Sequence, residues 1–465
     1  MIYMRCISFI AVLLCALLSV SAHSFAAHDA ELSNQSDGDT RAKKLACELI
    51  KAIEDNDIKK VKQFLATPGI DVNIACFRGE DSSTPLMAAV VSRRAEYVRL
   101  LLNAPGIDVN RPSVFDGVTY TPLVIALATG QTECVRLLLN APGIDVNIPV
   151  VFDGKTGTPL IVAVFSGSTE HVRLLLNAPG IDVNMPVVFD GKTGTPLIAA
   201  IGSGSIELVR LLLNAPGIDV NMPGVFDGES ITPLMEASAS GQTEIVRLLL
   251  YAKGINVNST DRAGHTALHF AAREGRKDCI RLLLAASGIN VNPVDQDGNT
   301  PLFYAVDNDH RDCVYLLLSD SRIDANIVLE KGMSLLHVIA GAPNVPNRIP
   351  YLRHLLNAHG ILVNKADDKG STPLHYCVMN VDDPECLRLL LSAPGIDVNH
   401  ADCKGWTALH GAALLGKTKF VEMLLATPGI NPYAVDSSGN TALYIAQKKG
   451  YTRIAELLRA AMKKK

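Results

Sequence analysis

The chain has 465 residues, of which 48% are hydrophobic, 19% are charged and only 5% are aromatic. This apolar content excludes a disordered chain, and the scarcity of aromatic rings predicts a core of Leu, Val, Ile and Ala. The formal net charge of −4 offers no concentrated basic face, so we expect no nucleic-acid partner.

Residues 1–22 have the composition of a secretory signal peptide. Arg5 precedes an apolar run that reaches Leu18, and the small residue Ala22 stands at the expected cleavage point. A transmembrane anchor needs roughly 17–25 apolar residues, more than this run supplies. We therefore expect an exported chain, secreted or, in a bacterium, periplasmic, with no membrane span after cleavage.

Residues 23–43 are polar and show no periodicity, which predicts a flexible leader. A regular pattern follows, and we expect a repeat array over residues 44–463. Within this array, residues 44–73 have the character of a divergent first unit.

A Thr-Pro-Leu stretch, or a close variant of it, recurs along the chain at intervals of 34 to 38 residues. It starts at Thr84, Thr121, Thr158, Thr195, Thr232, Thr266, Thr300, Ser334, Thr372, Thr407 and Thr441. A period of this size predicts a stacked array in which each unit buries its apolar face against the next. Together with the divergent first unit, the pattern gives about twelve repeats.

Each repeat has the pattern of two short helices followed by an extended finger. Thr caps the first helix, Pro occupies its first turn, where its missing N–H is not needed, and a glycine such as Gly130 ends it. The second helix carries a Leu triplet and stops at Ala-Pro-Gly. Ile-Asp-Val-Asn then leads into a hairpin that reaches the next Thr.

These motifs resemble ankyrin repeats along essentially the whole chain after the leader. The matching features are Thr-Pro-Leu-His at Thr372, Thr-Ala-Leu-His at Thr407, the Val-Arg-Leu-Leu-Leu second helices and the Asp-Val-Asn before each finger. The resemblance implies a mainly α ankyrin-repeat solenoid of stacked helix-turn-helix units with projecting β-hairpin fingers. It also implies a concave surface that binds proteins, and it implies no catalysis.

The stretch FDGKTGTPLI occurs at residues 152–161 and again at 189–198, and it contains the Gly-Lys-Thr of a phosphate-binding loop. Such a loop also requires a glycine five positions before the Gly-Lys pair, where this chain has Pro149 and Pro186. Gly154 instead completes an Asp-Gly turn pair. We interpret the stretch as a copied finger and expect no cofactor.

Four histidines share the fourth place of the helix-start motif: His269, His337, His375 and His410. Neighbouring units stack about 10 Å apart, too far for these side chains to share a metal whose nitrogen bonds are about 2 Å long. We expect them to join adjacent loops by hydrogen bonds, with no metal and no catalytic residue. The alternative is an enzyme with a small site near the insertion at residues 337–359, within a divergent repeat at about 327–364.

Eight cysteines remain after cleavage of the signal. Cys134, Cys279, Cys313 and Cys386 take the same place before the Leu triplet, which predicts buried thiols. Cys279 and Cys313 are one repeat apart, beyond the roughly 7 Å limit between bridged Cα atoms. Cys76 and Cys403 fall in fingers, where we expect exposure. Cys377 and Cys386 lie on the two helices of one repeat, and the sequence leaves open whether they are bridged.

A column of arginines marks the second helices, each three residues after an acid. Arg136 follows Glu133 and Arg247 follows Glu244 in this way. We expect a solvated face of ion pairs within each helix rather than an anion-binding stripe.

The repeats at about 111–250 have long fingers. Ten residues separate Asp-Val-Asn from Thr-Pro-Leu there, against seven before Thr266, and each long finger includes Val-Phe-Asp-Gly. Alternation along a strand puts a valine column on one face and a phenylalanine column, Phe115, Phe152, Phe189 and Phe226, on the other. A ribbon one layer thick cannot hide both faces, so we predict a partner-binding surface at the phenylalanines, with mutual stacking of their rings as the alternative.

Uncharged residues follow the first-helix Ala pair in the first half of the array, whereas Arg273, Glu274 and Asp307 take these places later. The uncharged set includes Thr129, Phe165, Ser166, Ser203 and Ser240. We predict that these residues and the phenylalanine column bind a neutral or apolar partner.

The predicted function is a non-enzymatic, monomeric protein–protein interaction scaffold that acts outside the cytoplasm. Its protein partner is not identified by the sequence, and the alternative is an inert structural spacer. Because finger tips lie outside the helical core, we expect the fold to survive replacement of all four phenylalanines.

Overall fold

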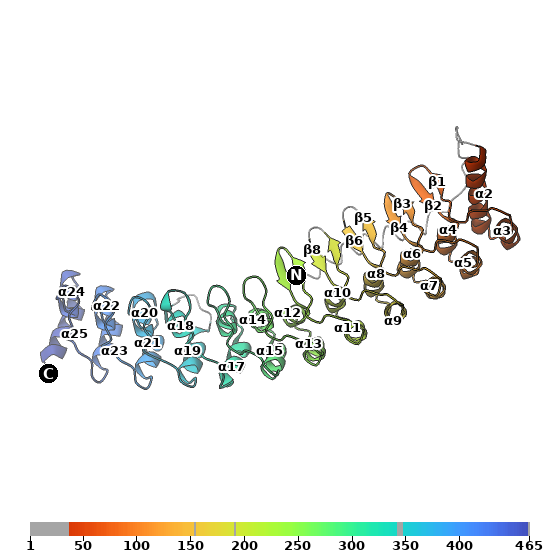
Figure 1. The fold of residues 1–465 in the computed structure, drawn as a ribbon. Helices are drawn as coiled ribbons and strands as arrows, with labels where there is room; N and C mark the ends of the chain where they lie inside the picture. Colours follow the sequence, from red (N-terminus) through yellow and green to blue (C-terminus); the bar gives the residue numbers. More distant parts are fainter. Residues whose placement is uncertain (1–36, 153–154, 190–191, 342–346, 464–465) are drawn as a thin grey trace. The chain divides into compact units, whose positions relative to one another are not determined.

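The computed structural model describes residues 37–152, 155–189, 192–341 and 347–463, which form two compact units (Figure 1). The first unit holds the described residues up to Ala237 together with Glu244–Asn256. The second holds Ser238–Thr243, Val257 and the described residues after it. The predicted signal peptide lies outside the described residues.

The first unit consists of helix pairs that stack in chain order. Its first helices are α2 (Asp37–Glu54), α4 (Pro85–Val91), α6 (Pro122–Ala128), α8 (Pro159–Phe165) and α10 (Pro196–Ser203). Its second helices are α3 (Ile58–Leu65), α5 (Ala95–Leu102), α7 (Thr132–Leu139), α9 (Thr169–Leu176) and α11 (Ile206–Leu213). Both α12 (Pro233–Ala239) and α13 (Thr243–Leu250) contribute residues to each unit.

Helix α2 begins earlier than expected. Residues 37–43 were predicted to belong to the flexible leader, yet they are helical. The helix buries Leu49 and Ile53, and its contacts with α3 and α4 support a longer element than the local sequence indicated. A disulfide between Cys47 and Cys76 then joins α2 to the first finger.

The first helix of each repeat is fixed by its cap. In α8 the side chain of Thr158 accepts a hydrogen bond from the N–H of Ile161 at 3.2 Å, and Pro159 occupies the first turn. Helix α10 ends at Gly204, whose φ of 70° is the left-handed conformation that glycine adopts most easily. The predicted Thr-Pro start is therefore confirmed.

The core is built from the first helices, which are almost entirely buried, and from one stripe of each second helix. In α7 this stripe consists of Cys134, Val135 and Leu138, all buried, whereas the two outer leucines of the triplet are only half-buried. The spacing of three residues follows from helical periodicity, which brings i and i+3 to one face. Each Leu triplet thus supplies mainly its middle member to the interior.

One asparagine in each repeat bonds to the next repeat. The Nδ2 of Asn184 donates to the carbonyl of Gly217 at 2.8 Å, and its Oδ1 accepts from the N–H of Asp219 at 2.9 Å. Within the first unit Asn73, Asn110, Asn147 and Asn221 make the same pair of bonds. These side chains satisfy backbone groups that the turn after each second helix leaves without helical partners.

The fingers of the first unit are antiparallel hairpins that project from the same side of their helix pairs (Figure 1). The strands are β1 (Cys76–Arg78), β2 (Asp81–Ser83), β3 (Ser113–Phe115), β4 (Val118–Tyr120), β5 (Val150–Phe152), β6 (Lys155–Gly157), β7 (Val187–Phe189), β8 (Lys192–Gly194), β9 (Gly224–Phe226) and β10 (Glu229–Ile231). Strands β1–β6 form one sheet and β7–β10 another. The repeated FDGKTG stretch is therefore a finger, with Val151 paired to Thr156 and Val188 to Thr193.

The register turns two members of the phenylalanine column, Phe115 and Phe226, inward. Phe115 is only 5% exposed and Phe226 only 4%, so the prediction that these two rings form an open partner surface is wrong. Both share the inner face of their hairpins with other buried residues, Val118 opposite Phe115 and Ile231 on the paired strand of Phe226. The side chains of Phe152 and Phe189, at the ends of β5 and β7, lie outside the described part.

The second unit repeats the helix pairs with shorter fingers. Its first helices are α14 (Ala267–Arg273), α16 (Pro301–Asp307), α18 (Leu335–Gly341), α20 (Pro373–Asn380), α22 (Ala408–Leu414) and α24 (Ala442–Lys448). Its second helices are α15 (Lys277–Leu284), α17 (Arg311–Ser319), α19 (Arg348–Leu356), α21 (Pro384–Leu391), α23 (Thr418–Leu425) and α25 (Thr452–Lys463), and a 3-10 turn, η1, covers Glu330–Gly332.

The short fingers are held by aspartates rather than by strands. The Oδ1 of Asp261 accepts hydrogen bonds from the N–H groups of Ala263 and His265 at 3.0 and 2.7 Å. Asp295, Asp367, Asp402 and Asp436 repeat this arrangement. In this unit the described fingers contain only an isolated bridge, between Val435 and Thr441.

The four motif histidines cap the first helices of the second unit. In α20 the Nδ1 of His375 accepts from the N–H of Thr372 at 3.1 Å, while its Nε2 lies 2.9 Å from the carbonyl oxygen of Trp406 in the next repeat. His269, His337 and His410 have the same contacts. The prediction that these residues join adjacent loops is confirmed.

We expect Asn184→Ala to lower the free energy of unfolding by about 1–2 kcal/mol, because Gly217 and Asp219 lose their hydrogen-bond partner. Urea unfolding followed by circular dichroism would measure the loss. Asn177→Ala is the matched control, since that exposed asparagine should tolerate the change within about 0.5 kcal/mol. Equal effects of the two changes would contradict the role given to Asn184.

We expect Phe226→Ala to destabilise the first unit by roughly 3 kcal/mol, because the ring is buried. Val188→Ala, at a partly exposed position of a neighbouring finger, should change the stability by roughly 0.5 kcal/mol or less. Thermal unfolding of both variants checks this difference. A stable Phe226→Ala protein would restore the expectation that the fold survives loss of the phenylalanines.

We expect the second unit to lose stability as the pH falls from about 6.5 towards 4. Burial lowers the pKa of His269 to about 4 and also lowers the pKa values of His337, His375 and His410. These groups bind more protons when unfolded, so their contribution is complete above pH 6.5 and disappears as the pH approaches the folded pKa. Hydrogen-exchange protection at pH 7 and pH 4.5, corrected for intrinsic rates, should decrease most in α14, α18, α20 and α22. Equal loss in α4 and α6, which carry Met87 and Val124 at the histidine position, would contradict this expectation.

Candidate protein-binding surface

The outer face of the finger hairpins carries a row of valines. We call Val114, Val151, Val188 and Val225 the valine row; Val151 is 50% exposed and Val188 38%. Cross-strand pairing puts hydroxyl residues beside them on the same face, with Ser82 opposite Val114, Thr119 opposite Val151 and Thr193 opposite Val225. The face thus alternates small apolar and small polar side chains.

The hydroxyl groups beside the valine row bond to the backbone of the next finger. The Oγ of Ser82 accepts from the N–H of Val114 at 3.2 Å, and Thr156 and Thr193 accept from Val188 and Val225 at 3.0 and 3.1 Å. These bonds hold adjacent fingers together. Because the paired residues are valines, serines and threonines, the centre of the face carries no charge.

Charged residues lie near the finger tips. Lys192 pairs with Asp227 of the following finger at 3.0 Å, and the carboxylate of Asp81 accepts from the N–H of Asp116 at 2.9 Å. The apolar end of the face is extended by Phe77 in β1, which is 61% exposed and pairs with Ser82. An exposed aromatic ring of the described fingers therefore lies in the first hairpin, where the sequence motifs predicted no site.

The predicted residues at the first-helix ends lie on the surface or half-buried. The hydroxyls of Thr129, Ser166 and Ser203 donate to carbonyls of their own helices, those of Ile125, Ala163 and Ala200, at 2.6–2.9 Å. Phe165 is half-buried, and Ser240, which belongs to the second unit, is exposed. The bonded hydroxyls present a short, uncharged surface, as the sequence predicted.

The same places in the second unit are charged. Arg273 and Glu274 form an ion pair at 3.6 Å, and the guanidinium of Arg273 lies 4.8 Å from the centroid of Phe270. Asp307 and Lys449 are exposed. The predicted difference in charge between the two halves of the array is present in the structure.

The arginine column makes two kinds of ion pair. Arg247 pairs with Glu244 of its own helix at 3.2 Å, as expected. Arg136 instead pairs with Glu170 of the next repeat at 2.6 Å, and Arg99 with Glu133 at 3.1 Å. These two arginines reach the next repeat because the second helices lie side by side, which brings the glutamate of the following helix within ion-pair distance. All these groups are exposed, so each pair contributes little to stability.

The histidines near the insertion do not converge. His337 is fully buried in its cap, whereas His354 and His359 are exposed on and after α19. Among the described residues, no group of three or more His, Cys, Asp or Glu side chains is placed to hold a metal ion. The geometry gives the enzyme alternative no assembled site in this part of the chain.

The described cysteines largely match their predicted environments. Cys134, Cys279, Cys313 and Cys386 are buried and Cys403 is exposed. Burial raises the pKa of Cys134 and Cys313 to about 11, which makes them inert thiols. The bridge between Cys47 and Cys76 was missed, because only the folding of the first finger onto α2 brings these residues together.

A buried polar cluster in the second unit was also missed. Asp261 contacts Nδ1 of His265 at 2.9 Å, Nε2 of that histidine contacts Tyr304 at 3.0 Å, and Tyr304 donates to Asp295 at 2.7 Å. Burial raises the pKa of Tyr304 to about 12, and the bond to Asp295 adds to this shift. Because these groups bind one another, the cluster stabilises two fingers. In the sequence, the feature that could have indicated this cluster is the aspartate five residues before the capping threonine: Asp261 before Thr266 and Asp295 before Thr300.

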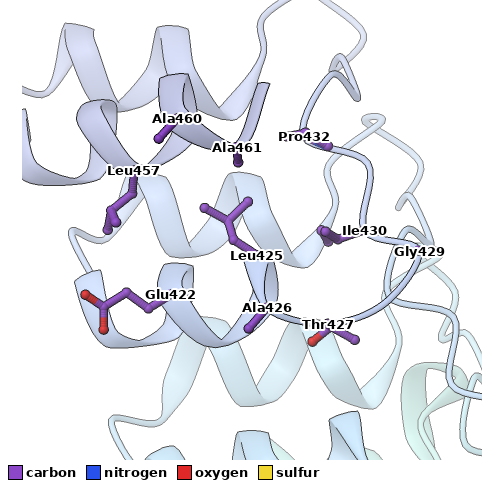
Figure 2. Close-up of a pocket in the computed structure, with 10 residues that line it drawn as sticks. All are labelled: Glu422, Leu425, Ala426, Thr427, Gly429, Ile430, Pro432, Leu457, Ala460 and Ala461. Atoms are coloured by element: carbon purple, nitrogen blue, oxygen red, sulfur yellow. The ribbon is translucent and has the colours of Figure 1, made fainter. Parts of the chain in front are cut away.

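A pocket of about 470 Å³ lies at the end of the second unit, between α23 and α25. Figure 2 shows Leu425, Leu457 and Ala461 around it, with Glu422 at one side. Tyr433 stands here at the position of the asparagine that in other repeats bonds to the next repeat. Its hydroxyl donates to the carbonyl of Met462. The lining of the pocket is mostly apolar and includes one carboxylate, that of Glu422.

The described residues contain no helix with the length and apolar character needed to cross a bilayer. No curated protein matches the chain. Among solved structures, the chain is similar to one described as the crystal structure of EF0377, an ankyrin repeat protein. The two are 27% identical over 41% of this chain and 96% of that one, with a TM-score of 0.38.

A family model of ankyrin repeats, three copies long, matches the chain six times in overlapping segments. The matches cover residues 49–150, 115–187, 186–261, 234–328, 321–402 and 394–465. They extend from the first helix pair to the last, in agreement with the stacked pairs, the Thr caps and the fingers. The chain belongs to the ankyrin-repeat family.

Proposed function

We propose that this protein is an exported, non-enzymatic scaffold that binds a partner protein through the fingers and first-helix ends of its first unit. Ankyrin repeats are a protein-interaction module, and this membership supports a binding role. The observation that carries the assignment to this surface is the exposure of Val151 and Val188 in neighbouring fingers. Apolar side chains that recur on one exposed face usually mark an interaction site.

The valine row replaces the phenylalanine column in this proposal. Phe115 and Phe226 are buried on the inner face of their hairpins, so these two rings are not open to a partner. The hydroxyls beside the valines already accept backbone hydrogen bonds. A partner can therefore cover this face without having to supply charges, which favours an uncharged protein surface of small apolar side chains.

The proposal of export is supported by two features. The composition of residues 1–22 fits a secretory signal. The disulfide between Cys47 and Cys76 is of a kind that persists in oxidising compartments and is rare in the cytosol.

We expect Val151→Asp with Val188→Asp to abolish capture of the partner from an extracytoplasmic fraction, because the change buries two unpaired charges in the contact. The measurement is affinity capture with the tagged full-length chain, followed by mass spectrometry. Val294→Asp with Val435→Asp, at two half-exposed valines of the second unit, is the matched control and should capture the partner normally.

Three results would count against the proposal. Normal capture by the Val151 and Val188 double variant would remove the valine row from the site. Loss of capture by the control alone would move the site to the second unit. If the wild-type chain captured no partner, the result would favour the inert spacer. Unchanged melting temperatures would show that the variants report binding rather than folding.

A further inference from the structure

The turn between α20 and α21 has no residue in the left-handed conformation, whereas the turn after α16 has Asp309 with a φ of 56°. Helix α22 is followed by Gly416, with a φ of 70°. Helix α20 has no such glycine, and its C-cap is Val381 in an extended conformation. The chain therefore reverses here without the residue that makes this turn easy.

Two basic side chains from neighbouring repeats hold this turn. The Nζ of Lys417 donates to the carbonyls of Val378 and Val381 at 2.8 and 2.7 Å and pairs with Asp382 at 2.9 Å. On the other side, Arg348 pairs with Asp383 at 3.1 Å. The turn is thus fixed from both directions, which keeps the ends of α20 and α21 in one arrangement.

Two cysteines face each other across the same helix pair. Cys377 in α20 and Cys386 in α21 are both fully buried, and the Cys377 thiol donates a hydrogen bond to the Cys386 sulfur at 3.3 Å. Only a small movement separates this contact from a covalent bond, and the clamped turn limits any movement apart. Cys134, Cys279 and Cys313 occupy the equivalent of the Cys386 position, each in a different repeat.

We propose that Cys377 and Cys386 form a second disulfide of this protein, closed during folding by a disulfide oxidant such as glutathione disulfide or a thiol–disulfide oxidoreductase. The bridge would join the two helices of a repeat whose turn lacks a residue in the left-handed conformation. This inference concerns covalent structure and does not depend on partner binding.

The chemistry balances as an exchange reaction. The Cys386 thiolate attacks one sulfur of glutathione disulfide, forms a mixed disulfide and releases one glutathione. The Cys377 thiolate then attacks the Cys386 sulfur, closes the protein disulfide and releases the second glutathione. The two thiols thereby lose two protons and two electrons, and glutathione disulfide is reduced to two glutathione molecules.

Burial sets the timing of these steps. Because both sulfurs are fully buried in the folded repeat, the oxidant must react before the neighbouring repeats close over them. Once formed, the bridge is protected from reductants by the same burial.

The decisive experiment refolds the reduced, full-length chain in a glutathione redox buffer and alkylates its free thiols in denaturant. Trypsin releases residues 370–388 as one peptide that contains both cysteines. We expect this peptide to be two hydrogens lighter than the dithiol form, without alkyl groups, until it is reduced. A second cleavage before Asp382 should leave two pieces that separate only after reduction.

Paired variants provide an independent readout. If the bridge forms, Cys386→Ala frees Cys377 and raises the number of titratable thiols by one relative to wild type. Cys313→Ala, the matched change at a buried thiol in another repeat, lowers the number by one. A decrease in both variants, or a wild-type peptide that is alkylated twice before reduction, overturns the proposal. If Cys386→Ala fails to fold, the wild-type peptide alone decides.

Discussion

The asparagine bonds between successive repeats are the interaction on which the rest of each unit depends. Each repeat is only two short helices, and the turn after the second helix leaves a carbonyl and an N–H without partners. In the first unit, Asn110 satisfies both groups for the following repeat, those of Gly143 and Asp145. The bonds fix the spacing at which the buried valines and leucines of adjacent second helices meet. Removing one bond therefore affects two repeats.

The fingers of the two units are stabilised differently, and as a result their surfaces differ. In the first unit the fingers are strands that pair with one another, so alternate side chains face outward in a row. In the second, five fingers are tight turns around an aspartate such as Asp295, and histidines such as His269 bond to the finger of the next repeat. One unit consequently presents an uncharged ribbon, whereas the other presents separate polar tips. The proposed site for an uncharged partner is therefore on the first.

Local features were predictable because they depend on neighbours a few residues away. The threonine caps, the glycine stops and the buried thiol of Cys134 followed from motif and helical period alone. The wrong predictions share another origin. The direction of Phe115, the start of α2 and the pairing of Arg136 are decided by an element of another repeat or by the adjacent finger. For the candidate site, the sequence located the long fingers but chose the wrong face of them.

By itself, the sequence determined the repeated helix pair, the family and the division into long-fingered and short-fingered halves, since a motif copied along a chain specifies the same local contacts each time. Only the tertiary structure decided which finger face is buried. Side chains alternate between the two faces of a strand, and the sequence does not say which of these faces is turned inward. The tertiary structure also decided the disulfide between Cys47 and Cys76, which meet when a hairpin folds back on α2. The sequence had already placed Cys377 and Cys386 on the two helices of one repeat, and the structure adds the contact between their sulfurs.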